Sequence, residues 1–335
     1  MVMISDNFKT MLRIVGVFFI IILTDIHSDD RLPTLPSKVE NQRKTIDIFA
    51  KALYWYTSET LDWAFTLKSD QNFVQTSYKT FSFDWSPGFS VGFRYNMEHD
   101  KWDTQASYTR FQSKATDHAS GSVTPAFLAA RLSLLEPFST GKARLNLHYN
   151  IFDWDLGRNF LVGKQFFLRP SIGLRGGWIN QNIYSDWTIP HFLDLFLFSA
   201  SENLKQRFHG VGPKGGISGK YRIGNIQRHS FNFIGQFELG YLWGHWSIKD
   251  KYIDNLSTVI YVKTLDRNFG SLVLHSFMGF EWDCKTEQDR YYFRLKFGYE
   301  IEDWLNHCQI FSDASGSQNN DLILQGLNFG LHFDF

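Results

Sequence analysis

Apolar and polar residues alternate along most of the chain, and the last segment shows this pattern most clearly. Side chains at alternate positions of a β-strand point to opposite faces of the sheet. The segment from Asp321 to Phe335 is therefore predicted to be a strand with one face suited to lipid and one suited to water. The apolar set is Ile323, Leu327, Phe329, Leu331, Phe333 and Phe335, and the opposite set is Gly326, Asn328, Gly330, His332 and Asp334.

The same alternation recurs upstream and predicts about ten strands of the ~9 to 11 residues that a tilted membrane strand needs. Twelve strands remain open, because Lys51 to Leu67 or Ser257 to Arg267 has room for another pair. The apolar positions change from odd to even numbers around Ile151 and Phe152. An extra residue in a strand shifts its alternation, so a β-bulge is predicted there.

Short and long connections alternate between these strands. Short turns on the periplasmic side and long loops on the outer side are typical of outer-membrane barrels. With both ends of the barrel on the short-turn side, the number of strands must be even. The short connections are Glu98 to Lys101, Val162 to Gln165, Gly224 to His229 and Lys285 to Asp289, and the long ones are Ser69 to Thr80, Ser113 to Gly141, Tyr184 to Arg207, Asp250 to Arg267 and Asn306 to Asn320.

The predicted fold class is therefore all-β: a transmembrane, antiparallel, up-and-down β-barrel in the outer membrane of a Gram-negative bacterium, with the long loops extracellular. Phe, Trp and Tyr make up 17% of the 335 residues, and the lipid-facing band of a barrel with its aromatic girdles accounts for such a content. The 34 basic residues equal the 34 acidic ones and form no basic run. This balance argues against a nucleic-acid partner.

The N-terminal part does not share the strand pattern. Lys9 and Arg13 precede the apolar run from Ile14 to Leu23, as in an export signal. Residues 1–28 are predicted to be a signal peptide, residues 29–50 a polar periplasmic linker, and residues 51–335 the barrel. The cleavage site and the true start codon stay open.

The polar faces of the predicted strands carry charges of both signs. Mixed charge inside a barrel predicts either a weakly selective pore or a narrow interior filled by ion pairs. The predicted lumen-lining charges are Arg94, Arg169, Arg175, Lys214, Lys220, Arg294, Lys296, Asp84, Glu238, Glu281, Glu300 and Glu302, and Arg144 was placed on the same faces.

No motif indicates an enzyme, a metal site or a cofactor. His148, Asp153 and Asp155 form the only group that resembles an acid–base or metal cluster, and the expected bulge separates them. Cys284 and Cys308 are predicted near opposite ends of their strands, across a wall about 25 Å tall, which excludes a disulfide between them.

Several blocks of the sequence also resemble one family, the Legionella-type major outer-membrane proteins, which also occur in environmental chlamydiae. The resemblance spans roughly residues 51–335, and it implies a surface-exposed, pore-forming barrel. The long loops depart most from the family pattern. The matching blocks are Phe83–Trp85, Gly92–Asp103, Tyr108–Phe111, His148–Asn150, Asp155–Arg158, Leu168–Pro170, Gly173–Ile179, Gly210–Gly216 and Leu324–Phe335.

The predicted function is passive diffusion of small hydrophilic solutes or ions. The alternative is a structural or adhesive surface barrel with a plugged lumen and loops that contact a host. The expected partners are outer-membrane lipid and the barrel-assembly machinery, which would read the terminal residues Phe329, Leu331, Phe333 and Phe335. The sequence leaves open the selectivity and whether the barrel forms a homo-oligomer.

Overall fold

Strands make up almost all of the described structure. The computed structural model describes residues 45–335 except 71–72, 98–99, 134–135, 164, 193–195, 227, 286–290 and 313–315. The signal peptide and most of the linker predicted from the sequence lie outside these residues. The long strands are β1 (Thr45–Ser58), β4 (Ser86–Asn96), β5 (Trp102–Pro125), β6 (Phe138–Arg158), β8 (Phe166–Phe192), β9 (Phe196–Ile226), β10 (His229–Asp254), β11 (Val259–Lys285), β12 (Tyr292–Ser312) and β13 (Gly316–Asp334).

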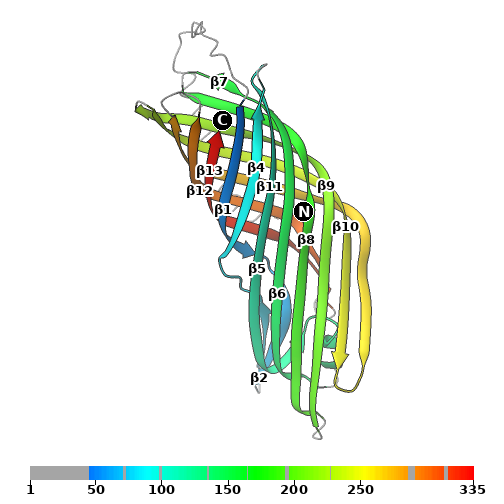
Figure 1. Ribbon diagram of the computed structural model, residues 1–335. Coiled ribbons are helices and arrows are strands. Elements are labelled where there is room, and N and C mark those ends of the chain that lie inside the picture. The colour runs from blue at the N-terminus through cyan, green and yellow to red at the C-terminus, as the bar shows by residue number, and fades with distance from the viewer. Residues whose placement is uncertain are drawn as a thin grey trace.

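These ten strands form a closed antiparallel ring, which confirms the predicted ten-stranded barrel (Figure 1). The order around the ring is β5-β4-β1-β13-β12-β11-β10-β9-β8-β6, and β6 pairs with β5 again. The first and last strands close it, since the backbone amides and carbonyls of Ile46 and Phe335 bond to each other at 3.0 Å in both directions. Closure leaves no unpaired ring edge in the lipid.

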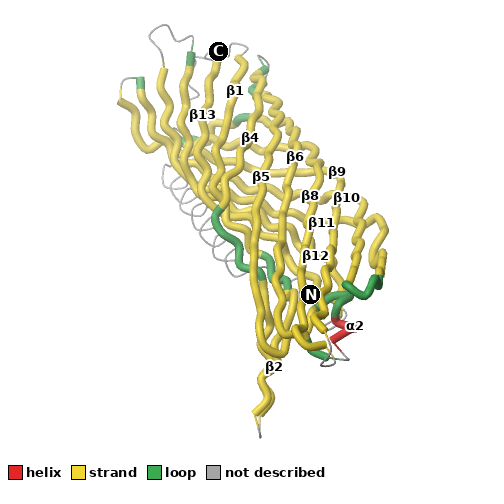
Figure 2. The backbone as a smooth tube through the Cα atoms, turned by 60° about the horizontal axis from the view of Figure 1, so that its bottom comes forward, coloured by secondary structure: helices red, strands yellow, loops and turns green. Residues whose placement is uncertain are grey.

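Four short elements lie off the ring. Strands β2 (Asp62–Asp70) and β3 (Phe73–Thr80) form a hairpin between β1 and β4, and β2 also pairs with β5. Strand β7 (Phe160–Val162) pairs with β8, and helix α2 (Ala130–Ser133) follows β5 (Figure 2). Among the described residues, no helix is both long and apolar enough to cross a membrane.

The barrel starts earlier than the sequence suggested. Strand β1 begins at Thr45, so residues 45–50 belong to the wall rather than to the linker. Asp47 supplies the physical reason, because its carboxylate faces inward and lies 2.5 Å from the guanidinium of Arg294. A charge on the polar face of a strand fits a barrel, whereas it looks like linker composition when the sequence is taken alone.

The longer ring strands, such as β6 and β8, reverse their apolar face partway along. In β8, the outward positions Ile172, Leu174 and Trp178 are apolar and exposed, and the inward positions between them are small or charged. Beyond Trp178 the outward positions are polar, whereas the inward side chains of Ile179, Ile183 and other apolar residues are buried. The first half is built for lipid outside. The second half is built like a water-exposed barrel with an apolar core.

This reversal replaces the predicted bulge at Ile151 and Phe152. Pairing of β6 with both neighbours runs through these residues without a register shift. Odd-numbered side chains of β6 face inward throughout, from Ala143 to Gly157. The apolar residues change sides because the surroundings of the wall change from water to lipid, not because the strand slips.

The long loops are mostly strand, which corrects the predicted boundaries. The segment 184–207, for example, belongs to β8 up to Phe192 and to β9 from Phe196 onward. The paired strands β8–β9 reach furthest from the lipid-facing half, and β5, β6, β10 and β11 also extend in this direction (Figure 1). The outer part of the molecule is therefore a stiff extension of the barrel wall.

Candidate functional site: the barrel interior

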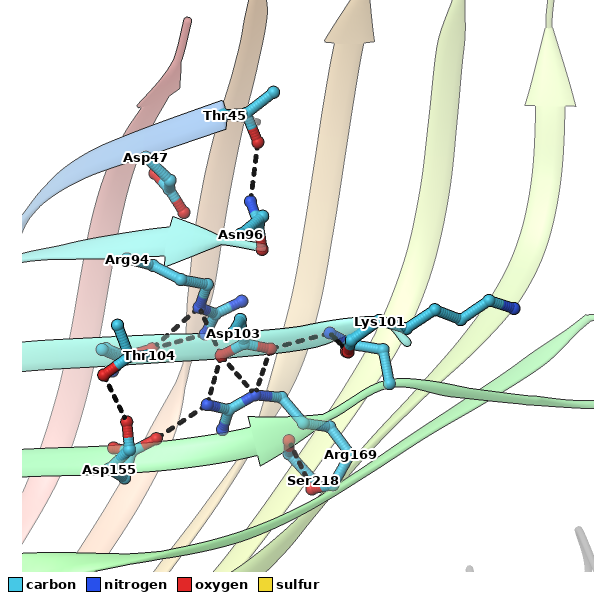
Figure 3. Close-up of polar contacts among 12 residues, drawn as sticks. Thr45, Asp47, Arg94, Asn96, Lys101, Asp103, Thr104, Asp155, Arg169 and Ser218 are labelled. Atoms are coloured by element: carbon cyan, nitrogen blue, oxygen red, sulfur yellow. Dashed lines mark hydrogen bonds and ion pairs between the residues drawn. The ribbon is translucent and has the colours of Figure 1, made fainter. Parts of the chain in front are cut away.

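The interior of the lipid-facing half is filled by ion pairs, and one group lies near the short-turn end. Arg169 on β8 donates to Asp103 on β5, with Nε 2.9 Å from Oδ2, and its Nη2 lies 2.7 Å from Asp155 (Figure 3). Arg94 Nε lies 3.8 Å from Asp103 Oδ1 and donates to Gln105 at 3.0 Å. Asp103 is fully buried. Neutralising it requires the arginines, since a lone buried carboxylate is strongly disfavoured.

A second group of charges lies on the opposite part of the ring. Lys220 on β9 contacts Glu281 at 2.5 Å and Asp283 at 2.6 Å, both on β11. Lys296 on β12 lies 3.3 Å from Glu281. Every carboxylate in this group faces at least one ammonium, so the interior carries both signs close together.

The third group lies further into the barrel and crosses it. Arg175 on β8 contacts Asp153 on β6 at 2.7 Å and reaches Glu302 on β12 at 3.4 Å. Lys214 on β9 lies 3.3 Å from both Asp153 and Glu238. Strands β8 and β12 are four steps apart around the ring, so the Arg175–Glu302 contact spans the lumen rather than following the wall.

Above these charges, aromatic side chains meet across the barrel. Tyr149 on β6 and Trp304 on β12 lie on opposite walls, five steps apart around the ring, and their ring centroids are 6.1 Å apart. Tyr149 also donates its hydroxyl to the Glu302 carboxylate. Further ring contacts continue the layer to both sides. They are Trp55–Phe111 at 5.2 Å, Trp55–Tyr149 at 6.1 Å, Phe208–Trp304 at 6.1 Å and Phe208–Trp246 at 4.5 Å.

We call these six residues the aromatic layer: Trp55, Phe111, Tyr149, Phe208, Trp246 and Trp304. They come from six of the ten ring strands, and each is at most 3% exposed. Protein interiors are packed about as densely as organic crystals, and aromatic contacts of this kind hold rings in defined orientations. The aromatic layer therefore fills the cross-section of the barrel between opposite walls.

Two cavities lie inside the barrel below the aromatic layer. The larger has a volume of about 460 Å³ and includes Arg94, Lys220, Arg294 and Lys296 in its lining. A second void of about 50 Å³ extends it towards Tyr149. We call the larger one the vestibule. It is wide enough for several waters or a small solute, whereas the second void is not wide enough for much more than water.

The projecting half is filled by a second apolar core and a few buried acids. Trp63, Phe138, Trp187 and their neighbours form the core, fully buried among residues of eight or more elements. Glu202 accepts from the Ala129 amide at 3.1 Å. Burial and the charge of Asp250 raise the pKa of the Glu202 carboxyl well above its usual value. Burial thus disfavours the charged form of this acid, and its bond to Ala129 ties the segment before α2 to the wall.

Eleven of the twelve charges predicted from the sequence point into the barrel, and the groups above bring most of them together. Asp84 does not: it is exposed and precedes β4, which begins at Ser86. The alternating pattern continues into the residues before Ser86, although the strand itself begins only there. Arg144 also faces outward, on the projecting part of β6.

The one acid–base group considered in the sequence does not assemble. His148 faces outward, whereas Asp153 and Asp155 face inward on the same strand. In the described part of the chain, no three His, Cys, Asp or Glu side chains are grouped so that they fit a metal ion. No disulfide joins Cys284, in β11, to Cys308, in the projecting part of β12.

Sequence reasoning missed the aromatic layer. Its signal was present at Ile151 and Phe152, where the apolar positions change sides. Inward apolar residues such as Tyr149 were assigned to the lipid face of a bulged strand instead.

Comparison with protein families gives one match over most of the chain. The family described as "Legionella pneumophila major outer membrane protein precursor" matches residues 38–335. None of the curated protein sequences matches.

Three solved structures that are similar to this chain are outer-membrane proteins of low sequence identity. The outer membrane protease OmpT from Escherichia coli is 12% identical, with 89% of this chain and 99% of that chain covered and a TM-score of 0.40. The outer membrane protein OprG from Pseudomonas aeruginosa is 14% identical, with 88% and 98% covered and a TM-score of 0.27. The COG4313 outer membrane channel from Pseudomonas putida F1 is 9% identical, with 89% and 98% covered and a TM-score of 0.27.

Proposed function

Because the chain belongs to the family of the Legionella pneumophila major outer membrane protein, and is thus an outer-membrane β-barrel protein, we propose that it serves as a surface-exposed structural barrel whose lumen is closed. The observation that carries this proposal is the contact between Tyr149 and Trp304 on opposite walls. A solute that crosses the barrel must separate these rings. The sequence favoured a passive diffusion channel over a plugged barrel, and the filled interior argues for the plugged barrel.

The ion pairs below the aromatic layer support the same conclusion. Arg175 is nearly fully buried and contacts Asp153 and Glu302 on two other strands. Opening a path beside it would separate charges in a medium of low polarity, and removing one partner of such a pair costs about 3 to 5 kcal/mol. Water and small ions would not supply this energy at every passage.

The shape of the projecting half agrees with a role at the cell surface. Its wall is continuous with the membrane strands, and its core is fully packed, with Trp63 and Trp187 completely buried. A stiff barrel of this kind holds its outer hairpins at a fixed distance from the membrane. Adhesion to a host surface, the alternative considered from the sequence, would use those hairpin ends.

A second candidate function is a gated diffusion channel, which the vestibule favours. Its volume of about 460 Å³ and its charged lining give a solute a place to enter from the short-turn side. Conduction would then require displacement of the aromatic layer. The two candidates differ in whether the wild-type protein ever opens.

Planar-bilayer recording separates them. The wild-type protein should show no discrete conductance steps at low voltage, whereas Tyr149→Ala combined with Trp304→Ala should produce steps by removing the two rings that meet. Phe280→Ala serves as the control, since this ring is 57% exposed on the lipid face of β11. Frequent steps in the wild type at low voltage would refute the closed barrel, and steps only above a threshold voltage would favour the gated channel.

A further inference from the structure

The outer wall of the projecting half is basic, although the chain as a whole has no net charge. In the projecting half, beyond the aromatic layer, the inward acids Glu202, Asp250 and Asp254 are buried in the core. Outward positions of the same strands carry mainly lysine and arginine. Strand alternation therefore separates the two signs, with acid inside and base outside.

Three lysines lie side by side on three neighbouring strands. In the register of the sheet, Lys249 on β10 is directly opposite Lys205 on β9 and directly opposite Lys263 on β11. Like charges directly opposite each other destabilise a sheet. Lys263 contacts Asp266, whereas the described residues include no ion-pair partner for Lys205 or Lys249. The positive charges of Lys205 and Lys249 are therefore not balanced by a carboxylate of the described residues.

Basic side chains surround this row. On β5, β6, β8, β9, β10 and β11, nine outward basic side chains face two outward acidic ones, Asp186 and Asp266. We call the nine the basic wall. They are Arg110, Lys114, Lys142, Arg144, Lys205, Arg207, Lys249, Lys251 and Lys263.

The basic wall begins where the lipid-facing band ends. On β10, Trp243 is the last exposed apolar ring, His245 follows on the same face, and Lys249 lies six residues after Trp243. At about 3.3 Å per residue and a tilt of about 40°, Lys249 lies about 15 Å above that ring. This is the depth of the headgroups rather than of the acyl chains.

We propose that the basic wall binds the phosphate groups of the phosphorylated glycolipid in the outer leaflet of the outer membrane. Lysine is a good point-charge partner for phosphate, and arginine binds it in a bidentate way. Basic side chains beside a membrane attract anionic headgroups over about a Debye length. A lipid fits better than a soluble anion, because the wall borders the lipid-facing rings and can hold the acyl chains of the same molecule against them.

The test uses the full chain, purified in neutral detergent without glycolipid. The midpoint temperature of unfolding is measured on gels, where folded and unfolded protein migrate differently. The measurement is repeated at increasing concentrations of phosphorylated lipid A. Lys205→Gln combined with Lys249→Gln should weaken the binding of lipid A about thirtyfold, because two basic contacts to the anionic lipid are lost. Lys68→Gln combined with Lys101→Gln removes the same charge from exposed sites on the β2–β3 hairpin and at the opposite end of the barrel, and should bind like the wild type.

Further arms distinguish the sources of phosphate. Dephosphorylated lipid A should stabilise the wild type much less, and Lys205→Arg combined with Lys249→Arg should keep the binding. Equal binding by dephosphorylated lipid A, or wild-type binding by the double glutamine variant, would overturn the proposal. Equal stabilisation by inorganic pyrophosphate would overturn the assignment to a lipid and indicate a soluble anion.

Discussion

The reversal of the apolar face predicts that the same substitution has very different effects at two outward positions of one strand. Leu239 and Ile253 both face outward on β10 and are 46% and 37% exposed. Leu239 lies in the segment with an apolar outer face, near the middle of the run from Phe231 to Trp243. Ile253 lies at the projecting end of the strand. Both are replaced by lysine.

A lysine on the lipid face near the bilayer midplane costs about 2 to 4 kcal/mol. A lysine at an outward position in water changes stability by about 0.5 kcal/mol or less. Leu239→Lys should therefore lower the free energy of unfolding by several times more than Ile253→Lys. The two side chains replaced are of equal size, which makes each variant the control for the other.

Equilibrium unfolding in urea, with the protein folded in lipid vesicles and followed by tryptophan fluorescence, measures the difference as a shift of the midpoint at constant slope. Equal losses for the two variants would refute the placement of the lipid boundary near Trp243. A larger loss for Ile253→Lys would mean that the projecting half, rather than the first half, lies in lipid.

Three further predictions concern single sites. Burial raises the pKa of Glu59 from 4.5 to about 7, so its contribution to stability is fully present below about pH 4.5 and is lost as the pH rises through 7. Glu59→Gln should make the free energy of unfolding fall less over this pH range. Arg169→Ala should cost about 3 to 5 kcal/mol in urea unfolding, because it leaves the buried Asp103 carboxylate without its main partner, and Arg169→Lys should recover part of the loss. Deleting Phe335 should reduce the amount of barrel in the outer membrane more than it lowers the stability of barrel already folded, and unchanged surface levels would contradict its role as an assembly signal.

Much of the architecture was predictable, because one rule governs every strand. Period-two alternation gave the number of ring strands and the outward direction of the terminal residues, of which Phe329 and Phe333 are 45% and 47% exposed. Short turns were placed well, since Gly163 and the residue pair Asp100–Lys101 adopt the positive φ angles that tight turns need. Each of these features depends on neighbouring residues alone.

What was missed depends on contacts between distant residues or on the solvent outside the wall. Alternation says which side chains share a face but not whether that face looks into the barrel. At Tyr149 the apolar face is the inner one, and at Phe152 it is the outer one. The contact between Tyr149 and Trp304 joins residues 155 positions apart in the sequence, and no local pattern encodes it.

The net charge of zero illustrates the same limit in the electrostatics. Equal numbers of acidic and basic residues argued against a basic nucleic-acid-binding surface. In the folded barrel, however, acids such as Glu202 and Asp250 are buried in the projecting core, and lysines such as Lys249 stay outside. A ligand meets only the outer face, so its electrostatic attraction follows the charges of that face and not the total. A neutral chain can therefore present a basic wall to a phosphorylated membrane.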